Sequence, residues 1–468
     1  MRDWYLQQDA VGIAGAIKTG EVSAVEVFDT AVGLAEQANE SLNAITVWDL
    51  ERARAALDHL PDGPLTGVPF LLKDLYTPME GLPSTDGTRL YPPAMPLYDS
   101  ELVRRFKAAG LVIFGRSAAP EFGLVSTTET QRHGATANPW SHEHSAGGSS
   151  GGAAAMVAAR VLPVAHASDG GGSIRIPASN CGVFGLKPTR ASVSAGPDFG
   201  EGWSGMSSAG VVSRSVRDSA AVLDAIRGNA PGDPYAAPAV RRPFLEEVAV
   251  EPEPLRIGMV TTPFTEVSVE AACIAGLQGA ALLLDGLGHA VDEHEPALGD
   301  DPWEVARPLV GVHTLRLLED VGALRGSRVH QSEVEAMTWR IASEGALVTA
   351  PEFARGIDRM HLMGRRLADS FAEFDLLVSP TTAVPPVPLG AMSMDRADDE
   401  AEGLLRQTVA FTLVANLTGV PAMSMPLHWS SDGLPVGVQF MAPMGREDVL
   451  FRLAGQLERA RPWEDRHP

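Results

Sequence analysis

The sequence predicts an α/β fold in which helices cover a largely buried β-sheet. Short apolar segments of strand length alternate with longer amphipathic segments along most of the 468 residues. The hydrophobic fraction of 45% is enough for a large core, and the most apolar windows are too short to span a bilayer. A chain of this length allows two or three domains, or one large α/β domain.

Residues 9–60 are expected to be helical, because amphipathic stretches begin near Glu21 and again near Leu50. Further along, apolar runs predict buried strands, and amphipathic runs predict the helices between them. Gly110 stands where one of these helices should end. The expected strands are 66–75, 111–115, 161–168, 255–260, 375–380 and 435–443, and the expected helices are 101–110, 151–160, 216–228 and 269–285.

Two further regions are less regular. Residues 229–254 are rich in proline and charge, which predicts a surface connection. Residues 262–374 are expected to be mostly helical and contain no recognisable motif.

The formal charge of −22 argues against nucleic acid and anionic membranes as partners, since a field of that sign repels phosphates. The negative charge is compatible with a small neutral or cationic substrate. Only two cysteines are present, with no disulfide framework and no CxxC metal site, and the N-terminus does not look like a signal peptide. We therefore expect a soluble, cytoplasmic protein.

Lys73 differs from the other cationic residues of the chain. Only four of the 37 cationic residues are lysines, and Lys73 follows the apolar run 68–72. A buried lysine can lose its proton, whereas an arginine cannot. Lys73 is thus a candidate general base. The alternative is a lysine that ends a buried strand and pairs with Asp74.

Two glycine-dense loops, Gly147–Gly152 and Gly170–Ser173, contain serines that allow several interpretations. Structured segments on both sides argue against a flexible linker. The absence of GxxxxGK[ST] argues against a phosphate cradle. A nucleophile elbow requires a preceding strand, and 138–147 is polar and turn-like. Ser149 or Ser150 could also simply cap a helix.

The last interpretation uses both loops. Gly170, Gly171 and Gly172 can direct successive backbone N–H groups at one point, which forms an oxyanion hole. Ser173 follows directly and could attack a carbonyl bound there. An attacking serine needs a base, and a second serine can pass its proton to a lysine.

The segments GVPFLLKD, GGSSGG and DGGGSIRIPASNCGVFGLKPT resemble the amidase signature family of serine hydrolases. The resemblance extends to 111–123, 138–140, 416–426 and 433–439. It therefore covers nearly the whole chain, and residues 230–375 match least. It implies a single domain with a large mixed central β-sheet covered by helices on both faces.

The resemblance also assigns a domain plan to residues 1–468. A signature core would occupy about 66–225, and a variable, mostly helical substrate-side region about 230–375. C-terminal strands in about 376–468 would complete the core. Family resemblance also suggests a homodimer.

Motif by motif, the resemblance implies a catalytic triad. Lys73 matches the catalytic lysine, Ser149 matches a bridging serine at a cis peptide bond, and Ser173 matches the nucleophile that forms an acyl-enzyme. In the implied mechanism, Lys73 takes a proton through Ser149 while Ser173 attacks the amide. No metal or organic cofactor is needed.

The remaining matches surround this triad. Gly170, Gly171 and Gly172 match the oxyanion loop. Asp169 and Arg175 match a pair that braces this loop, and Ser150 matches a supporting hydrogen-bond partner. The resemblance places Gly123, Leu124 and Val125 beside the substrate acyl group.

Within the family, VAHASDGGGSIRIPAS most resembles the bacterial branch that includes 6-aminohexanoate-cyclic-dimer hydrolase and related amidases and urethanases. Ser168 and Ile176 depart from the pattern of the tRNA-linked amidotransferases in this family. The expected substrate is a small linear or cyclic amide. A carbamate or ester hydrolase, a protein like the amidase component of those amidotransferases, and a catalytically silent binding protein remain alternatives.

Other reactive side chains are expected to be structural. His142 and His144 precede the first serine loop, but the lysine relay leaves no need for a histidine base. His166 lies in an apolar strand and is expected to be a satisfied core residue. Cys181 is expected to be buried packing.

Overall fold

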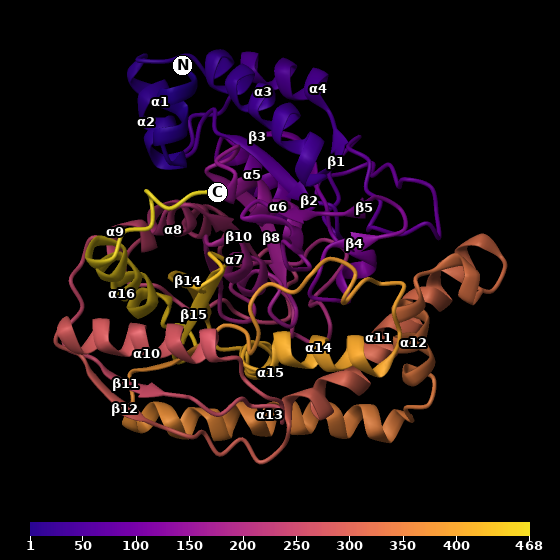
Figure 1. The fold of residues 1–468 in the computed structure, drawn as a ribbon. Coiled ribbons are helices and arrows are strands. Elements are labelled where there is room, and N and C mark those ends of the chain that lie inside the picture. Colours follow the sequence, from indigo (N-terminus) through magenta and orange to yellow (C-terminus); the bar gives the residue numbers. More distant parts are fainter.

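The computed structural model describes residues 1–468, and a mixed eight-stranded sheet runs through it (Figure 1). The strand order is β12-β11-β13-β15-β14-β9-β10-β8. β11 pairs in parallel with β12 and β13, and all other neighbours are antiparallel. The strands are β8 (Val164–Asp169), β9 (Phe184–Lys187), β10 (Ser208–Ser213), β11 (Arg256–Met259), β12 (Ala290–Glu293), β13 (Leu376–Pro380), β14 (Ala422–Trp429) and β15 (Pro435–Met441). One sheet therefore joins early, middle and late parts of the chain, and the predicted α/β class is confirmed.

A second, three-stranded sheet has the order β1-β3-β2. Its strands are β1 (Ile45–Trp48), β2 (Pro69–Lys73) and β3 (Val112–Ser117). Every residue of β2 is buried, which agrees with its unbroken apolar sequence. β2 lies against β8 of the large sheet, where the backbone N–H of Lys73 donates a hydrogen bond to His166 Nδ1 (3.1 Å). Two short ribbons pair β4 (Glu129–Thr130) with β5 (Gly134–Ala135) and β6 (Ala137–Asn138) with β7 (Ser141–Ser145).

Helices cover both faces of the large sheet, as the alternation along β15 shows. Gly437 and Gln439 face α7, where they meet Ser179 and Arg175. The intervening residues of β15 point to the opposite face and share a core cluster with apolar residues of α10. The helices are α1 (Arg2–Gln7), α2 (Ala10–Thr19), α3 (Ala24–Leu42), α4 (Leu50–Ala56), α5 (Glu101–Ala108), α6 (Gly151–Ala158), α7 (Arg175–Cys181), α8 (Val216–Ile226), α9 (Phe244–Glu247), α10 (Ala271–Gly286), α11 (Pro302–Arg325), α12 (Ala336–Gly345), α13 (Ala350–Glu373), α14 (Asp399–Val409), α15 (Leu413–Thr418) and α16 (Glu447–Ala460).

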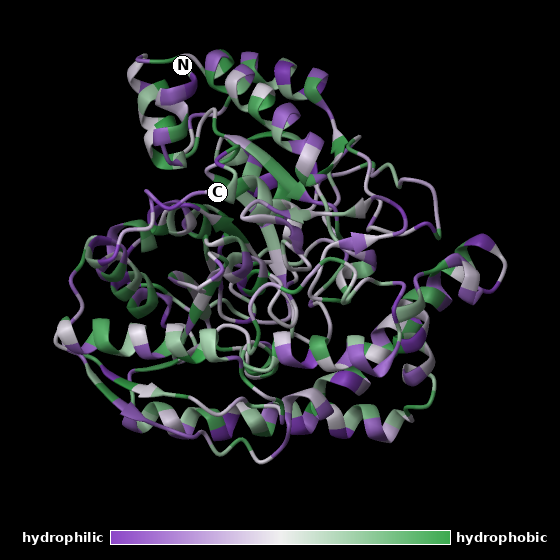
Figure 2. Ribbon diagram, in the orientation of Figure 1, coloured by the Kyte–Doolittle hydropathy of each residue, from purple (hydrophilic) through white to green (hydrophobic).

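Burial separates the inner helices from the outer ones. Every residue of α6 and α7 is buried, whereas α13 alternates between apolar and polar residues along its exposed length (Figure 2). This difference matters for function, because α6 and α7 directly follow the two serine loops. Both loops are thus attached to helices that are buried along their whole length. No helix combines the length and the apolar composition that crossing a bilayer requires.

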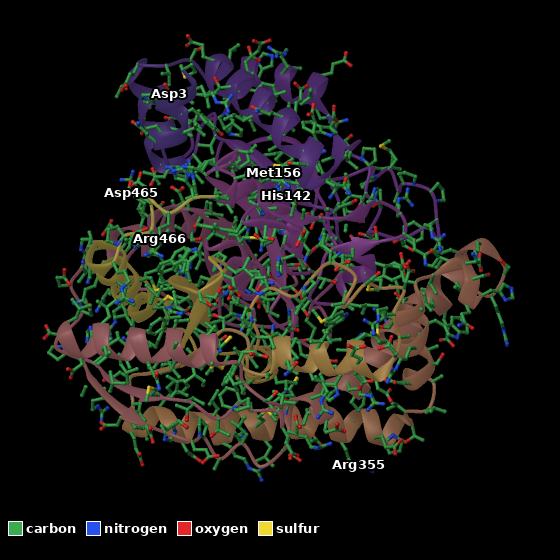
Figure 3. The ribbon with its side chains drawn as sticks, viewed as in Figure 1. Asp3, His142, Met156, Arg355, Asp465 and Arg466 are labelled. Atoms are coloured by element: carbon green, nitrogen blue, oxygen red, sulfur yellow. The ribbon has the colours of Figure 1, made fainter.

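The two ends of the chain meet on one side of the molecule, where Asp3, Asp465 and Arg466 are labelled in Figure 3. Arg214 joins them: its guanidinium donates to Leu6 O (2.8 Å), and its carbonyl accepts from Trp463 Nε1 (2.9 Å). Helix α1 and the C-terminal segment that follows α16 are therefore tied to the segment before α8.

Several elements differ from the sequence-based expectation. The stretch 9–60, expected to be helical, contains strand β1. The regions 229–254 and 262–374 contain the short helix α9 and the edge strand β12. Strands β9, β10 and β14 were not predicted, nor was helix α7. β9 is only four residues long, and Pro426 interrupts β14 at a bulge, so neither has a clear alternating pattern.

Helices α11 and α12 cross at two glycines. A Cβ atom placed on Gly345 would overlap the carbonyl oxygen of Gly311. The two backbones can approach this closely only because neither residue has a side chain. This crossing fixes the separation of two helices that line the site described below.

We predict that Gly345→Ala lowers stability by about 1–3 kcal/mol, because the added methyl group forces α11 and α12 apart. Gly15→Ala in α2 is the matched control: Gly15 has open space around it, so alanine should raise stability by up to ~1 kcal/mol through helix propensity. Thermal unfolding midpoints of both variants measure this. Equal midpoints for both variants would contradict the close crossing.

Candidate active site

Lys73 is fully buried at the end of β2, and its amine contacts serines only. Nζ donates hydrogen bonds to Ser149 Oγ (2.8 Å), Ser168 Oγ (3.0 Å) and Ser168 O (3.4 Å). Burial lowers the pKa of Lys73 to about 7, and the opposing effect of the Asp169 charge is smaller. A substantial fraction of Lys73 is therefore a neutral amine near pH 7.

The alternative pairing of Lys73 with Asp74 is wrong. The Asp74 carboxylate accepts from Thr46 Oγ1 (3.0 Å), Ser84 Oγ (3.1 Å) and the backbone N–H of Thr85 (2.8 Å). None of these donors hydrogen-bonds with the lysine amine, and no ion pair joins Asp74 to Lys73. The lysine thus has no carboxylate in contact that would hold it in the charged form.

The first serine loop places Ser149 between Lys73 and the start of α6. The Gly148–Ser149 peptide bond is cis, as the resemblance implied, and Ser149 is 2% exposed. Ser150 precedes α6 but makes no capping hydrogen bond with its side chain, so the capping interpretation is wrong for it. Its hydroxyl instead lies between the carbonyl (3.3 Å) and the N–H (3.4 Å) of Ser168.

The second loop runs from β8 through three glycines to Ser173. No hydrogen bond of the structure uses the N–H groups of Gly170, Gly171 or Ser173. The N–H of Gly172 differs from the expectation, because it donates to Asp169 Oδ1 (2.8 Å). The free donors are therefore two glycines and the serine. Gly172 has a φ of +137°, and a Cβ there would overlap Thr412 Oγ1, so the position requires glycine.

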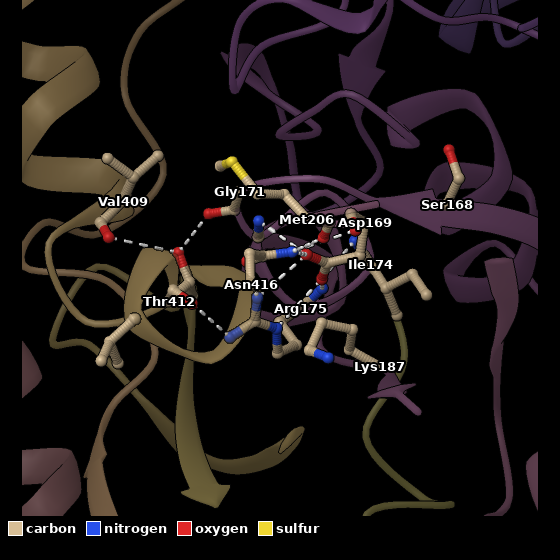
Figure 4. A network of polar contacts seen from close by, with 12 residues as sticks. Ser168, Asp169, Gly171, Ile174, Arg175, Lys187, Met206, Val409, Thr412 and Asn416 are labelled. Carbon is tan, nitrogen blue, oxygen red and sulfur yellow. Dashed lines mark hydrogen bonds and ion pairs between the residues drawn. The ribbon is translucent and has the colours of Figure 1, made fainter. Parts of the chain in front are cut away.

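Asp169 and Arg175 form a fully buried ion pair that closes this loop (Figure 4). Two guanidinium nitrogens contact the two carboxylate oxygens at 3.0 and 2.9 Å. Arg175 also donates to Gln439 Oε1 (2.6 Å) and to Asn416 Oδ1 (2.7 Å). Thr412 receives one more bond from Arg175 at its carbonyl and donates its hydroxyl to Gly171 O (2.7 Å). The network links β8, α7, α15 and β15.

Electrostatics keep this carboxylate charged. Burial alone would raise the pKa of Asp169, but the charge and hydrogen bonds of Arg175, helped by Asn416, bring it below its usual range. Asn416 Nδ2 donates to Asp169 Oδ1 (2.8 Å) and to Met206 O (3.0 Å). The pair thus stays ionised in the core.

Ser173 lies where two cavities meet. The apolar cavity has a volume of about 110 Å³ and the polar cavity about 250 Å³. Both are lined by Gly123, Leu124, Gly170, Ser173 and Trp203. Val125, expected beside the acyl group, lines only the apolar cavity, and Ser149 lines only the polar one.

Of the other reactive residues singled out from the sequence, only His166 lines one of the two cavities, the polar one. His142 and His144 lie on β7 and line neither cavity. His166 is buried, and burial lowers its pKa to about 3. Its Nε2 has no hydrogen-bond partner, so it is not the fully satisfied core residue expected. Cys181 is buried as expected, and burial raises the pKa of its thiol.

Four contact residues were not singled out from the sequence, and one of them is Gln439 of the matching segment 433–439. Ser168 precedes Asp169 in the signature block and was noted only as a departure from one subgroup. Asn416 lies in the matching segment 416–426, which could have pointed to it. Thr412 had no sequence signal, because its contact with the loop depends on how α15 packs.

The sequence profile of the Amidase family matches residues 26–451. The chain belongs to the amidase family. This amidase is therefore a hydrolase that acts on amide C–N bonds, and the resemblance noted in the sequence is confirmed.

Relatives match over nearly the full length of the amidase. The 6-aminohexanoate-cyclic-dimer hydrolase of Paenarthrobacter ureafaciens is 38% identical over 99% of this chain and 97% of that protein. A solved structure of 6-aminohexanoate cyclic dimer hydrolase superposes with a TM-score of 0.93 at 38% identity, and 99% of each chain is covered. A bacterial aryl acylamidase of the amidase signature family superposes with a TM-score of 0.89 at 25% identity, covering 97% of this chain and 96% of the other.

We predict that Asp169→Asn lowers the free energy of unfolding by about 3–5 kcal/mol, because it leaves the Arg175 charge buried without a partner. Asp300→Asn, which breaks a partly exposed ion pair with Arg359 (2.8 Å), is the control and should cost only about 0–1 kcal/mol. Denaturant unfolding of both variants measures the difference. Similar losses would show that the buried pair is not an unusual source of stability.

Proposed function

We propose that the amidase hydrolyses its substrate with Ser173 as nucleophile, Ser149 as proton relay and Lys73 as general base. The observation that supports this most directly is the 2.8 Å hydrogen bond from Lys73 Nζ to Ser149 Oγ. Burial of Lys73 favours its neutral amine, and no carboxylate contacts that amine. A lysine placed in this way can accept a proton near neutral pH.

The reaction has two halves. Ser173 Oγ attacks the carbonyl carbon while Ser149 takes its proton and passes its own to Lys73. The carbonyl electron pair moves to oxygen and returns when the C–N bond breaks. Ser149 then protonates the leaving nitrogen, and Lys73 restores the proton of Ser149. Water releases the acyl group from Ser173 by the same relay, giving a carboxylic acid.

We assign oxyanion binding to the free N–H groups of Gly170, Gly171 and Ser173. Gly172 has a different role, because its N–H holds Asp169 and thereby shapes the loop. Asp169 and Arg175 position this loop, and Ser150 positions Ser168. None of these three side chains needs to touch the substrate.

The two cavities suggest which half of the substrate goes where. Ser149 protonates the leaving nitrogen in this mechanism, and it lines the polar cavity only. The amine half therefore belongs in the polar cavity. The acyl half then occupies the apolar cavity, beside Gly123, Leu124 and Val125.

We propose small linear or cyclic amides as substrates. The cyclic class is supported by the full-length similarity to 6-aminohexanoate-cyclic-dimer hydrolase. Carbamates and esters are the second candidate, since an acyl-enzyme accepts an oxygen leaving group as well. The expected homodimer and cytoplasmic location are further parts of the proposal, and Cys181 and Cys273 are both free and buried.

A hydrolysis screen tests the substrate class. Linear, aryl and cyclic amides, carbamates and esters are incubated with wild type, Ser173→Ala and Lys73→Ala, and products are measured by mass spectrometry. We expect wild type to turn over at least one amide and each variant to lose about 10³-fold or more of that activity. Activity that survives Ser173→Ala would exclude Ser173 as nucleophile.

The pH profile tests the base. With a Lys73 pKa of about 7, kcat/KM should rise about tenfold per pH unit below that value and level off above it, because protonated Lys73 cannot accept a proton. Lys73→Arg should abolish activity. Lys187→Met is the matched control: Lys187 is also buried with a pKa lowered to about 7 by burial, but it lines neither cavity. A shift of this rise in kcat/KM along the pH axis in Lys187→Met would contradict Lys73 as the general base.

A further inference from the structure

The charged residues that line the apolar cavity are connected to one another by ion pairs. Arg307, Arg340, Glu344 and Glu402 line it, and every other lining side chain is uncharged. They come from three helices, α11, α12 and α14, which lie together at one end of the molecule (Figure 1). We call these four residues the clasp.

Arg340 holds the clasp together. Its guanidinium pairs with Glu402 of α14 and with Glu344 of its own helix (3.3 Å), and it donates to Ala397 O (2.6 Å). Glu344 in turn pairs with Arg307 of α11 (2.9 Å). One chain of ion pairs therefore joins three helices that no backbone hydrogen bond connects at this point.

The clasp stands between the cavity and solvent. Its side chains are between 19% and 41% exposed, whereas most apolar residues of the cavity wall are buried. None of the four lines the polar cavity, while the residues around Ser173 line both. The cavity thus has an inner end at Ser173 and an outer end at the clasp.

We propose that the clasp sets the upper length of the acyl group that the enzyme accepts. This inference rests on the proposed function, which places the acyl half in the apolar cavity. At about 110 Å³ the cavity is well below the ~300–1,000 Å³ typical of ligand sites, so a short chain fills it. A longer apolar chain reaches Arg340, where it must separate partly buried ion pairs that it cannot replace.

Alkyl fluorophosphonates test this without requiring turnover, because the serine displaces fluoride and stays labelled. Rates of Ser173 labelling are measured by mass spectrometry for butyl, hexyl, octyl and dodecyl reagents. We expect the wild-type rate to fall from hexyl to dodecyl. In Arg340→Ala the ratio of the dodecyl to the butyl rate should rise by up to about fivefold, the factor expected when a partly buried ion pair no longer has to open.

Three further variants test whether the effect is specific to the clasp. Glu402→Gln keeps the side-chain shape but removes the charge, so it should shift the ratio in the same direction by less. Val310→Phe narrows the same cavity from α11 and should shift preference towards shorter chains. Arg396→Ala is the control, because Arg396 makes a comparable cluster with Asp398 (2.9 Å) just before α14 but lines neither the apolar nor the polar cavity.

The possible results distinguish a failure of the clasp proposal from a failure of the proposed function. An unchanged chain-length profile in Arg340→Ala, or an equal change for every length, overturns the role of the clasp while leaving Ser173 as the labelled serine. A shift of the same size in Arg396→Ala also overturns it. Absence of labelling at Ser173 in wild type would instead overturn the proposed function, and the clasp assignment with it.

Discussion

A single ion pair without access to water, Asp169 with Arg175, determines the shape of the site. Its two partners lie on either side of the glycine loop in the sequence, and its remaining hydrogen bonds reach Asn416, Thr412 and Gln439. Burying two charges is costly unless every donor and acceptor is satisfied. The loop is therefore held by a network that tolerates little change, and the Gly172 N–H is used within it. The other donors of the loop stay free for this reason.

Lys73 shows the opposite way to bury a cation. Arg175 stays charged because a carboxylate contacts it, whereas Lys73 has only hydroxyl and carbonyl oxygens around its amine. Desolvation then favours the neutral form. The Asp169 carboxylate neutralises Arg175 through direct contact, whereas its effect on the pKa of Lys73 is smaller than that of burial. The choice of arginine at one position and lysine at the other follows from this difference.

Sequence reasoning found what depends on local pattern and family motif. The α/β class, the buried strand ending at Lys73 and both serine loops follow from apolar runs and glycine spacing. Strands such as β9 and β14 were missed because they are too short or are interrupted by Pro426. Gly172 was assigned as an oxyanion donor because nothing in the sequence reports that Asp169 uses its N–H. The clasp could not be predicted from the sequence either, because Arg307, Arg340 and Glu402 come together only through helix packing.

The scarcity of lysine has a practical consequence for chemical modification. Of the four lysines, Lys73 and Lys187 are fully enclosed, and only Lys18 and Lys107 reach the surface. Amine-reactive dyes, crosslinkers and biotin esters therefore meet only two lysine side chains on the folded enzyme. Such reagents can tether the molecule through α2 or α5, far along the chain from both serine loops. Acylation of Lys73 or Lys187 would in turn report that the core has opened.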